Sequence, residues 1–408
     1  MNRRNVLKYA SLLAAAGLVP IGMQGWADRG LGQSNNRKRL IVIFLRGGID
    51  GLNVVVPYQE AAYYDARPKI AIPKPGKKDG LLDLDGRFGL HPALADLMPL
   101  WKQGSLAFIH ACGSPDSTRS HFDAQDYMES GTPGVKNTPD GWMNRLLATL
   151  PKGMPTQAVN MASITPRIMM GSMPVANLPM GRNSDRSLSV DRPEINRAFD
   201  RLYSGNDPIS LAYQDGREAR EILLAALESE MKAASKGAPD PSKLGKQTQK
   251  LARLLVGDAK TQLAFMDVGG WDTHVNQGGS KGGFARKLKS LGEGLVTLVE
   301  ELGSVYSDTA IAVLSEFGRT VKENGNGGTD HGHGNVMLLL GGGIRGGEVY
   351  GDWLGLEESQ LYNKRDLAVT TDFRDAIASL LEEHMELSAS QINSVFPEYT
   401  VNHLSLVR

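Results

Sequence analysis

Residues 309–343 contain two short apolar runs around a glycine- and asparagine-rich loop, and this pattern most limits the possible folds. Residues 310–314 and 336–340 are continuous, short and bounded by turn residues, which is typical of buried strands. A packed core does not need the loop between them, yet the loop holds a set of polar side chains. These are Glu316, Arg319, Asp330, His331 and His333. Carboxylate and imidazole groups suit zinc, manganese or iron, and glycine lets backbone approach such a centre closely. A plain solvated loop is the alternative interpretation.

Two other apolar runs also end beside glycine with a carboxylate or an imidazole. Residues 39–45 lead into Asp50, and residues 261–268 lead into Asp272 and His274. Residues two apart in an extended segment face the same way, so Asp272 and His274 can bind one ion. Open α/β sheets place their sites beyond the C-terminal ends of the strands, so we expect these groups to converge. For Asp50 alone, an ordinary glycine-rich turn explains the position equally well.

The order of strand-like and helical segments predicts an α/β fold with a mainly parallel central sheet flanked by helices. Further strands are expected at 106–111 and 158–162. Helical spacing is found at 91–103, 120–129, 243–255 and 284–302, and a final helix is expected to begin near Thr371–Asp372. We expect one domain over residues 38–408, with a helical excursion at about 192–256 and a polar linker at 28–37.

Ser120 stands at the start of a helical stretch and is a candidate nucleophile. The first turn of a helix presents free backbone N–H groups and a partial positive charge, which suits attack on a phosphate group. A simple helix cap fits the same position. Ser117 is the reserve candidate.

Composition excludes some classes of protein. Lysine plus arginine equals aspartate plus glutamate, at 45 each, so no overall basic field would recruit nucleic acid. Cys112 is the single cysteine, which excludes an internal disulfide framework, and its apolar setting predicts a buried structural thiol.

The N-terminal residues resemble a twin-arginine export signal. Arg3 and Arg4 precede a moderately apolar stretch over residues 9–23, and Gly25 and Ala27 supply small residues for signal peptidase. We therefore expect residues 1–27 to be removed, with the twin-arginine translocase as export partner and a periplasmic or secreted mature protein. An ordinary N-terminal anchor helix is the alternative. We expect no stable transmembrane segment in the mature chain, because no other stretch is apolar enough.

Five motifs occur in order over residues 38–395: GGIDGLN, RSHF, GGWDTH, SEFGRT and TDHG. This set resembles a bacterial family of exported proteins known by a domain-of-unknown-function number (1501). That family in turn resembles the alkaline phosphatase and sulfatase superfamily. The resemblance implies an alkaline-phosphatase-like three-layer sandwich.

The superfamily resemblance also implies site roles. Asp50 matches a first metal-binding aspartate, and Ser120 matches the nucleophile. The remaining metal ligands would be Asp272, His274, Glu316, Asp330, His331 and His333. Phe317 stands where the superfamily has a histidine ligand, so Asp330 and His331 are the candidates to replace that ligand.

The implied chemistry is metal-dependent hydrolysis of a small-molecule phosphate or sulfate ester. One or two divalent ions, zinc or manganese, would serve as cofactor, and Arg119 or Arg319 would hold the ester oxygens. The alternative is a non-catalytic periplasmic binding protein that keeps the fold and part of the metal site. Fold resemblance alone does not separate these two functions.

Overall fold

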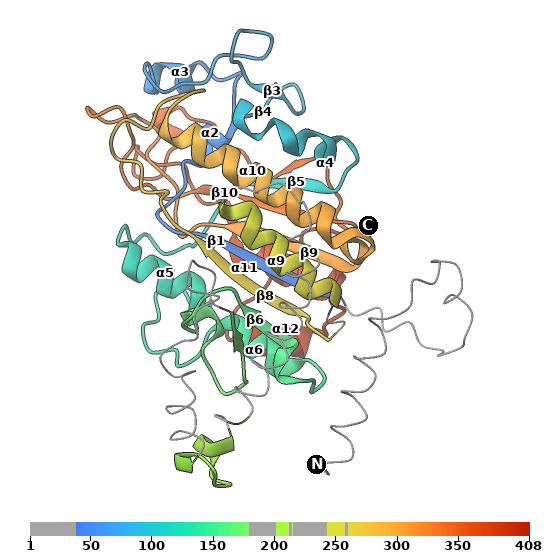
Figure 1. Ribbon diagram of the computed structural model, residues 1–408. Helices are drawn as coiled ribbons and strands as arrows, with labels where there is room; N and C mark the ends of the chain where they lie inside the picture. The colour runs from blue at the N-terminus through green and yellow to red at the C-terminus, as the bar shows by residue number, and fades with distance from the viewer. Residues whose placement is uncertain (1–37, 179–200, 212–213, 215–242, 258–259) are drawn as a thin grey trace, which may run out of the picture. The chain divides into compact units, whose positions relative to one another are not determined.

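The computed structural model describes residues 38–178, 201–211, 214, 243–257 and 260–408 (Figure 1). Residues 37–408 form one compact unit. The expected signal segment at 1–27, the linker at 28–37 and most of the excursion at 192–256 lie outside the described residues. Among the described residues, no helix is long and apolar enough to cross a membrane.

A nine-stranded sheet forms the centre of this unit. Its order is β11 (Val349–Tyr350), β5 (Leu106–Gly113), β10 (Asn335–Gly341), β9 (Thr309–Leu314), β1 (Arg39–Leu45), β8 (Leu263–Val268), β6 (Ala158–Asn160) and β7 (Ala176–Asn177), while β12 (Thr371–Asp372) pairs with β5. In the central pairing, Val42 of β1 lies between Phe265 of β8 and Ala312 of β9, parallel to both. Among the described strands of this sheet, only β10 runs antiparallel to its neighbours β5 and β9. The predicted mainly parallel sheet is confirmed.

Helices cover both faces of the sheet. One layer contains η2 (Pro92–Leu97), α4 (Met98–Lys102), α9 (Lys243–Gly257) and α10 (Gly283–Leu302). The opposite layer contains α6 (Trp142–Thr149), α11 (Phe373–Glu383) and α12 (Ala389–Val395). Each layer packs on its own face of the sheet, which gives the three-layer sandwich that the sequence predicts.

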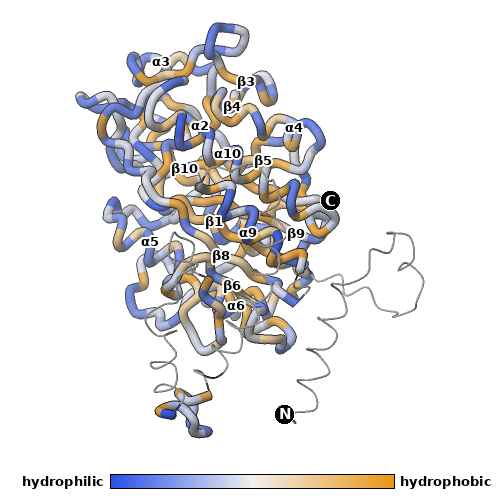
Figure 2. The backbone as a smooth tube through the Cα atoms, viewed as in Figure 1, coloured by the Kyte–Doolittle hydropathy of each residue, from blue (hydrophilic) through white to orange (hydrophobic). Residues whose placement is uncertain are grey.

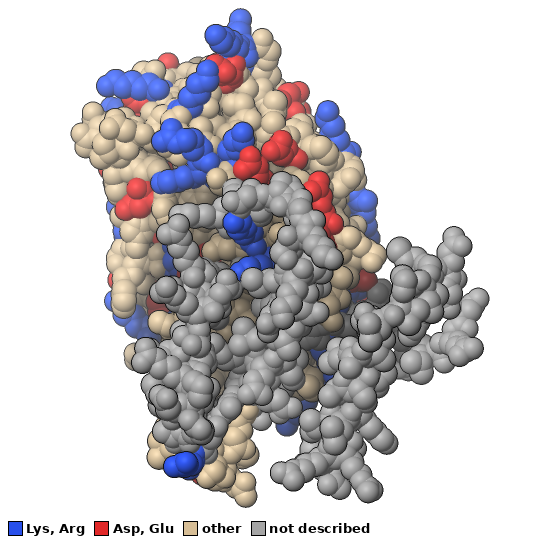
Figure 3. All heavy atoms as spheres, in the orientation of Figure 1, with Lys and Arg blue, Asp and Glu red and all other residues tan. Residues whose placement is uncertain are grey.

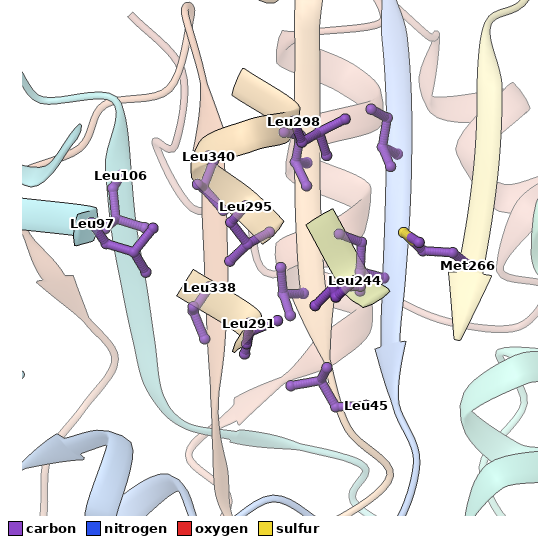
Figure 4. Close-up of a cluster of buried hydrophobic side chains, with 14 of the residues drawn as sticks. Leu45, Leu97, Leu106, Leu244, Met266, Leu291, Leu295, Leu298, Leu338 and Leu340 are labelled. Atoms are coloured by element: carbon purple, nitrogen blue, oxygen red, sulfur yellow. The ribbon is translucent and has the colours of Figure 1, made fainter. Parts of the chain in front are cut away.

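Strand β1 shows why both layers are needed. All seven of its residues are buried: Ile41, Ile43 and Leu45 belong to one apolar cluster, and Leu40, Val42 and Phe44 belong to the other. Successive side chains of a strand point to opposite faces, so a continuous apolar run requires cover on both sides. Figure 2 shows the central strands as apolar, and Figure 4 shows leucines of α10 facing Leu338 and Leu340 of β10.

The expected single helix at 91–103 consists of two pieces, η2 and α4. Leu94 leaves helical geometry with φ −100° and ψ 20°. Pro99 has no backbone N–H, so it cannot donate the hydrogen bond that would continue one α-helix through this point. Cys112 is buried and free, as predicted, and burial raises the pKa of its thiol.

Smaller elements surround one edge of the main sheet. A second sheet of three strands has the order β2 (Val55–Val56), β4 (Gly89–Leu90) and β3 (Leu82–Asp83), next to α2 (Gly51–Val54) and α3 (Ala61–Ala66). Helix α5 (His121–Ser130) follows β5 after a short loop. The remaining described elements are the 3-10 helices η3 (Pro155–Gln157), η4 (Arg167–Met169), η6 (Gly303–Asp308) and η7 (Glu358–Gln360).

The direction of β10 determines which loops meet. The C-terminal ends of parallel strands share one edge of a sheet, and the N-terminal end of an antiparallel strand lies at that same edge. The loops after β1, β5, β8 and β9 therefore meet the loop that precedes β10. Charges of both signs lie side by side on the face drawn in Figure 3, in keeping with the zero net charge.

Candidate metal centre

Three histidines from separate segments meet at one aspartate on this edge. His121 is the first residue of α5, Asp272 and His274 follow β8, and His331 precedes β10. The start of α5 is fixed by Ser120, whose hydroxyl accepts a hydrogen bond from the Asp123 backbone N–H. These segments are far apart in the sequence, and the sheet brings them together.

The Oδ1 atom of Asp272 is the centre of the cluster. It lies 2.9 Å from His274 Nε2, 3.3 Å from His331 Nε2 and 3.6 Å from His121 Nε2. Suitable ligand atoms of His121, Asp272 and His331 all lie within 4.8 Å of one another. The two nitrogens His274 Nε2 and His331 Nε2 are 2.9 Å apart. Nitrogen and oxygen donors thus gather in the space that one ion would occupy.

The other ring nitrogen of each histidine has its own partner. His121 Nδ1 is 2.8 Å from Glu316 Oε1. His331 Nδ1 is 2.9 Å from the backbone oxygen of Arg119. His274 Nδ1 is 3.2 Å from Asp330 Oδ1. Such partners fix ring orientation and tautomer in metal sites.

These partners determine which nitrogen carries the proton. A backbone carbonyl only accepts, so His331 Nδ1 must donate. Burial would raise the pKa of Glu316, but hydrogen bonds from His121 and Gln125 hold it below its ordinary value. The pKa of Asp330 is also lowered, chiefly by the hydrogen bond from Asn324. Both carboxylates are therefore ionised acceptors, and an imidazole of this cluster that carries its proton on Nδ1 alone presents an Nε2 lone pair toward Asp272.

His121 Nε2 gives an independent test of whether a cation fits. This atom is buried and has no hydrogen-bond partner. A buried polar atom without a partner carries a free-energy cost, which a bound ion would remove. The hydrogen bond to Glu316 raises the pKa of His121, because the carboxylate favours a positive charge on the ring, so a metal ion would have to displace a proton there. The donor set of imidazoles and a carboxylate fits a divalent transition ion.

Arg319 holds Asp272 in place. Its Nη2 donates to Asp272 Oδ1 at 2.6 Å, and its other contacts are to the backbone oxygens of Gly47, Gly48, Trp271 and Thr329. Burial would raise the pKa of Asp272, but the Arg319 guanidinium outweighs this effect and lowers it. Arg319 has no exposed side-chain surface. We therefore assign Arg319 to positioning Asp272. The resemblance had implied a different role for it, that of holding the ester oxygens.

Glycines allow the loops to approach closely, as expected. A Cβ at Gly47, whose φ is +119°, would lie 2.6 Å from the backbone nitrogen of Asp272. A Cβ at Gly332 would lie 2.4 Å from the backbone carbon of Arg319. Side chains at these two positions would push the ligand-bearing loops apart.

Asp50 lies in a separate buried network. Its Oδ2 accepts from Arg67 Nη1 at 2.7 Å and from Gln277 Nε2 at 2.6 Å, and its Oδ1 has no partner. Asp50 and Arg67 both have fully buried side chains. The sequence predicts that Asp50 lies with the histidines as a metal ligand, and the structure places it elsewhere. The guanidinium of Arg67 already neutralises the Asp50 carboxylate.

Glu316 and His333 also differ from their expected role as direct ligands. Glu316 is buried and accepts from the Gly47 N–H, Gln125 and His121, so it supports His121 from behind. The His333 ring stacks on Tyr362 with centroids 4.5 Å apart, and burial lowers its pKa. Among the described residues, the group whose ligand atoms all lie close together is His121, Asp272 and His331, and it contains neither Glu316 nor His333. His274 is outside that group too, but its Nε2 lies 2.9 Å from both Asp272 Oδ1 and His331 Nε2.

Ser120 and Arg119 lie next to the cluster through His121 and His331. The Ser120 side chain is exposed and caps α5. The Arg119 side chain is 38% exposed and donates to Asp366 Oδ2 at 2.7 Å. Their predicted catalytic roles stay predictions.

Sequence reasoning missed His121. The signal was present in the RSHF motif, where a histidine directly follows the predicted helix cap. The Phe317 side chain has no atom that could bind a metal, and its ring has a packing role. Its centroid lies 4.7 Å from that of His121 and 4.9 Å from that of His331. It therefore helps to fix the two imidazoles.

Comparisons with known proteins give remote structural similarity. No curated protein matches the chain in sequence. The C-terminal periplasmic domain of EcEptC from Escherichia coli is 10% identical, with 90% of this chain and 88% of that chain covered and a TM-score of 0.35. Ps i-CgsB in complex with k-i-k-neocarrahexaose is 10% identical, with 87% and 74% covered and a TM-score of 0.32.

A family model agrees with the five sequence motifs. It matches residues 37–396, which include every residue of the cluster described above. The chain therefore belongs to the family described as protein of unknown function (DUF1501).

Proposed function

We propose that this protein is an exported metal-dependent hydrolase of phosphate or sulfate esters. The observation that carries the proposal is the convergence of His121, His274 and His331 on Asp272 Oδ1. Each imidazole is held at Nδ1 by an acceptor and directs Nε2 inward. These four residues would hold a single divalent ion, zinc or manganese.

A bound ion would act as a Lewis acid on an ester oxygen. The chain supplies the rest of the site. Glu316 and Asp330 keep His121 and His274 in the tautomer that presents Nε2. Arg319 keeps Asp272 ionised and fixed. The exposed fractions of the side chains, 22% for His331 and 45% for Asp272, leave this centre open to a substrate.

Ser120 is the proposed nucleophile. It directly precedes His121, and its side chain is exposed. The first turn of α5 contributes free backbone N–H groups beside it, which favour an oxyanion. The hydroxyl oxygen would bond to phosphorus or sulfur as the bond to the ester alcohol breaks, and the hydroxyl proton would pass to the departing alcohol oxygen. Water would then hydrolyse the phospho- or sulfo-serine and restore the Ser120 hydroxyl.

Metal content and turnover together test the proposal. Purified protein is expected to bind about one transition ion per chain, measured by elemental mass spectrometry, and to hydrolyse members of a panel of aryl phosphate and sulfate esters. His274→Ala and His331→Ala should lose both properties. His403→Ala is the matched control, since His403 is exposed and pairs with Glu382 outside the cluster. Absence of bound metal in the unaltered protein would refute the proposal.

A non-catalytic binding protein is the second candidate, and one observation favours it. Asp50, Glu316 and His333 were expected as ligands, but each has another environment within the protein. A site with one metal ion neutralises the negative charge of the transition state less well than a site with two. Bound metal without turnover of any ester would support this candidate.

Export is part of the proposal. Its support is the sequence Asn2-Arg3-Arg4 before an apolar stretch. Replacing Arg3 and Arg4 with lysine should retain the protein in the cytoplasm, as measured by fractionation and immunoblotting. Periplasmic delivery of this variant at the normal level would rule out the twin-arginine route.

A further inference from the structure

Two arginines share one buried carboxylate next to the metal centre. Asp366 has no exposed side-chain surface. Its Oδ2 accepts from Arg119 Nη2 at 2.7 Å, and its Oδ1 accepts from Arg365 Nε at 2.9 Å. Arg365 Nη2 also lies 3.2 Å from Asp366 Oδ2. One carboxylate therefore anchors two guanidinium groups, Arg365 through two contacts and Arg119 through one.

Both arginines are bonded directly to His331. The backbone oxygen of Arg119 accepts from His331 Nδ1 at 2.9 Å. Arg365 Nη2 donates to the backbone oxygen of His331 at 2.6 Å. The Arg365 guanidinium and the Arg119 backbone are thus both held beside a histidine whose Nε2 faces Asp272.

Asp366 carries one negative charge and faces two arginines. The Arg365 guanidinium also acts on the Asp330 carboxylate, whose pKa it helps to lower. The side chains of Arg119 and Arg365 are 38% and 43% exposed. Their Nη1 groups donate to no described residue. Arg119 Nε also has no hydrogen-bond partner, but this atom is buried. Unused N–H donors on fixed guanidinium planes are suited to oxyanions.

The backbone of Asp366 is also fixed. It forms isolated bridges with Thr320 and with Tyr362. The Asp366 N–H donates to the Tyr362 backbone oxygen at 3.0 Å. An anchor held in this way limits the entropy that the arginines would lose on binding a ligand.

We propose that Arg119 and Arg365, anchored by Asp366, bind the tetrahedral oxyanion of the substrate beside the metal centre. The assignment of this anion to the substrate rests on the proposed function. The ligand class is a phosphate or sulfate group. Arg365 is a specificity-determining residue, and Asp366 is a positioning residue. A purely structural salt-bridge network would place no anion there.

Anion binding to metal-free protein tests this site separately from hydrolysis. Inorganic phosphate and inorganic sulfate are titrated by calorimetry at about pH 8, where unperturbed imidazoles are neutral. The unaltered protein is expected to bind at least one of these anions. Arg119→Gln and Arg365→Gln should each weaken binding by about tenfold or more, the loss expected for a charge-assisted hydrogen bond.

Two further variants test whether anion binding depends on the charge and planar shape of Arg365, and whether loss of any arginine has the same effect. Arg365→Lys keeps the charge but loses the planar fork, so its affinity should fall between those of the unaltered protein and Arg365→Gln. Arg253→Gln is the matched control, since Arg253 also pairs with a carboxylate, Glu301, but on α9. It should bind the anions normally.

The outcomes distinguish failure here from failure of the proposed function. Equal anion affinity in the unaltered protein and in both glutamine variants would overturn the inference, as would no binding at all. Anion binding that is lost in these variants supports the site even if no ester is hydrolysed. If the protein is an active enzyme, Arg365→Gln should raise KM for the ester while metal content stays the same.

Discussion

His274 and His331 face each other through their Nε2 atoms, 2.9 Å apart. Both rings have acceptors at Nδ1, so two lone pairs meet at this short distance. Lone pairs that face each other repel, and a shared cation removes the repulsion. An ion bound by both nitrogens would therefore link the two loops.

The first prediction concerns stabilisation by metal. Zinc or manganese at about 100 times its Kd should stabilise the folded protein by about 2.7 kcal/mol. Thermal denaturation with added metal and with a chelator measures this effect. His274→Ala should abolish the difference between the two conditions, whereas His403→Ala should keep it. An equal metal-induced shift in His274→Ala would exclude this histidine as a ligand.

The second prediction concerns the residue behind His121. Glu316→Gln should weaken metal binding by about 10- to 100-fold, the usual effect of removing a partner of a metal-bound histidine. Competition with a chromophoric chelator measures the affinity. Glu129→Gln is the control, because Glu129 is also buried but pairs with Arg46. Unchanged affinity in Glu316→Gln would show that Glu316 does not position His121.

The third prediction concerns Asp50 and Arg67. Arg67→Met should lower the free energy of unfolding by about 3–5 kcal/mol, because it leaves a buried carboxylate without its partner. Adding Asp50→Asn should recover part of this loss, as measured by urea denaturation. Metal content should be normal in the double variant. Loss of metal from that folded variant would return Asp50 to the set of ligands.

The fourth prediction concerns two buried neutral histidines. His91 and His110 each accept a backbone N–H at Nδ1 and donate from Nε2 to a carbonyl. A protonated ring would place a proton against that N–H. Burial lowers the pKa of each to about 4.

Both folded-state pKa values lie below the ordinary value near 6.5, so stability depends on pH. The contribution is fully present above about pH 6.5 and is lost as pH falls toward about 4. The total is on the order of a few kcal/mol. Denaturation of metal-free protein over this range should show a smaller pH dependence in His110→Gln. An unchanged slope would show that His110 does not titrate on unfolding.

The fifth prediction separates the two roles of Ser120. Ser120→Ala should cost about 1 kcal/mol of stability through loss of the helix cap, whereas Ser120→Asn should keep the cap. Both variants should lose ester turnover while metal content stays the same. Full turnover in the asparagine variant would eliminate Ser120 as nucleophile and leave Ser117 as the reserve.

The strands and the layer order followed from the sequence. Residues 39–45 and 310–314 are continuous apolar runs, and a strand of this kind is stable only with both faces covered. The motif RSHF likewise showed where α5 begins, because Ser120 is a good cap. Local patterns of this kind depend on neighbours in the sequence, so the sequence determined them.

Tertiary structure decided which residues make up the candidate metal centre. Asp272, His274 and His331 were found from their positions at strand ends, but His121 was missed because its position after a helix cap does not show where its ring points. Asp50 follows a strand in the same way, yet Arg67 occupies its carboxylate. Which charged partner reaches a carboxylate depends on loops that the sheet brings together. The sequence by itself therefore determined the mainly parallel sheet with helices on both faces and the edge where the polar loops meet. The packing of distant loops decided which side chains lie together at that edge and which arginine compensates each buried carboxylate.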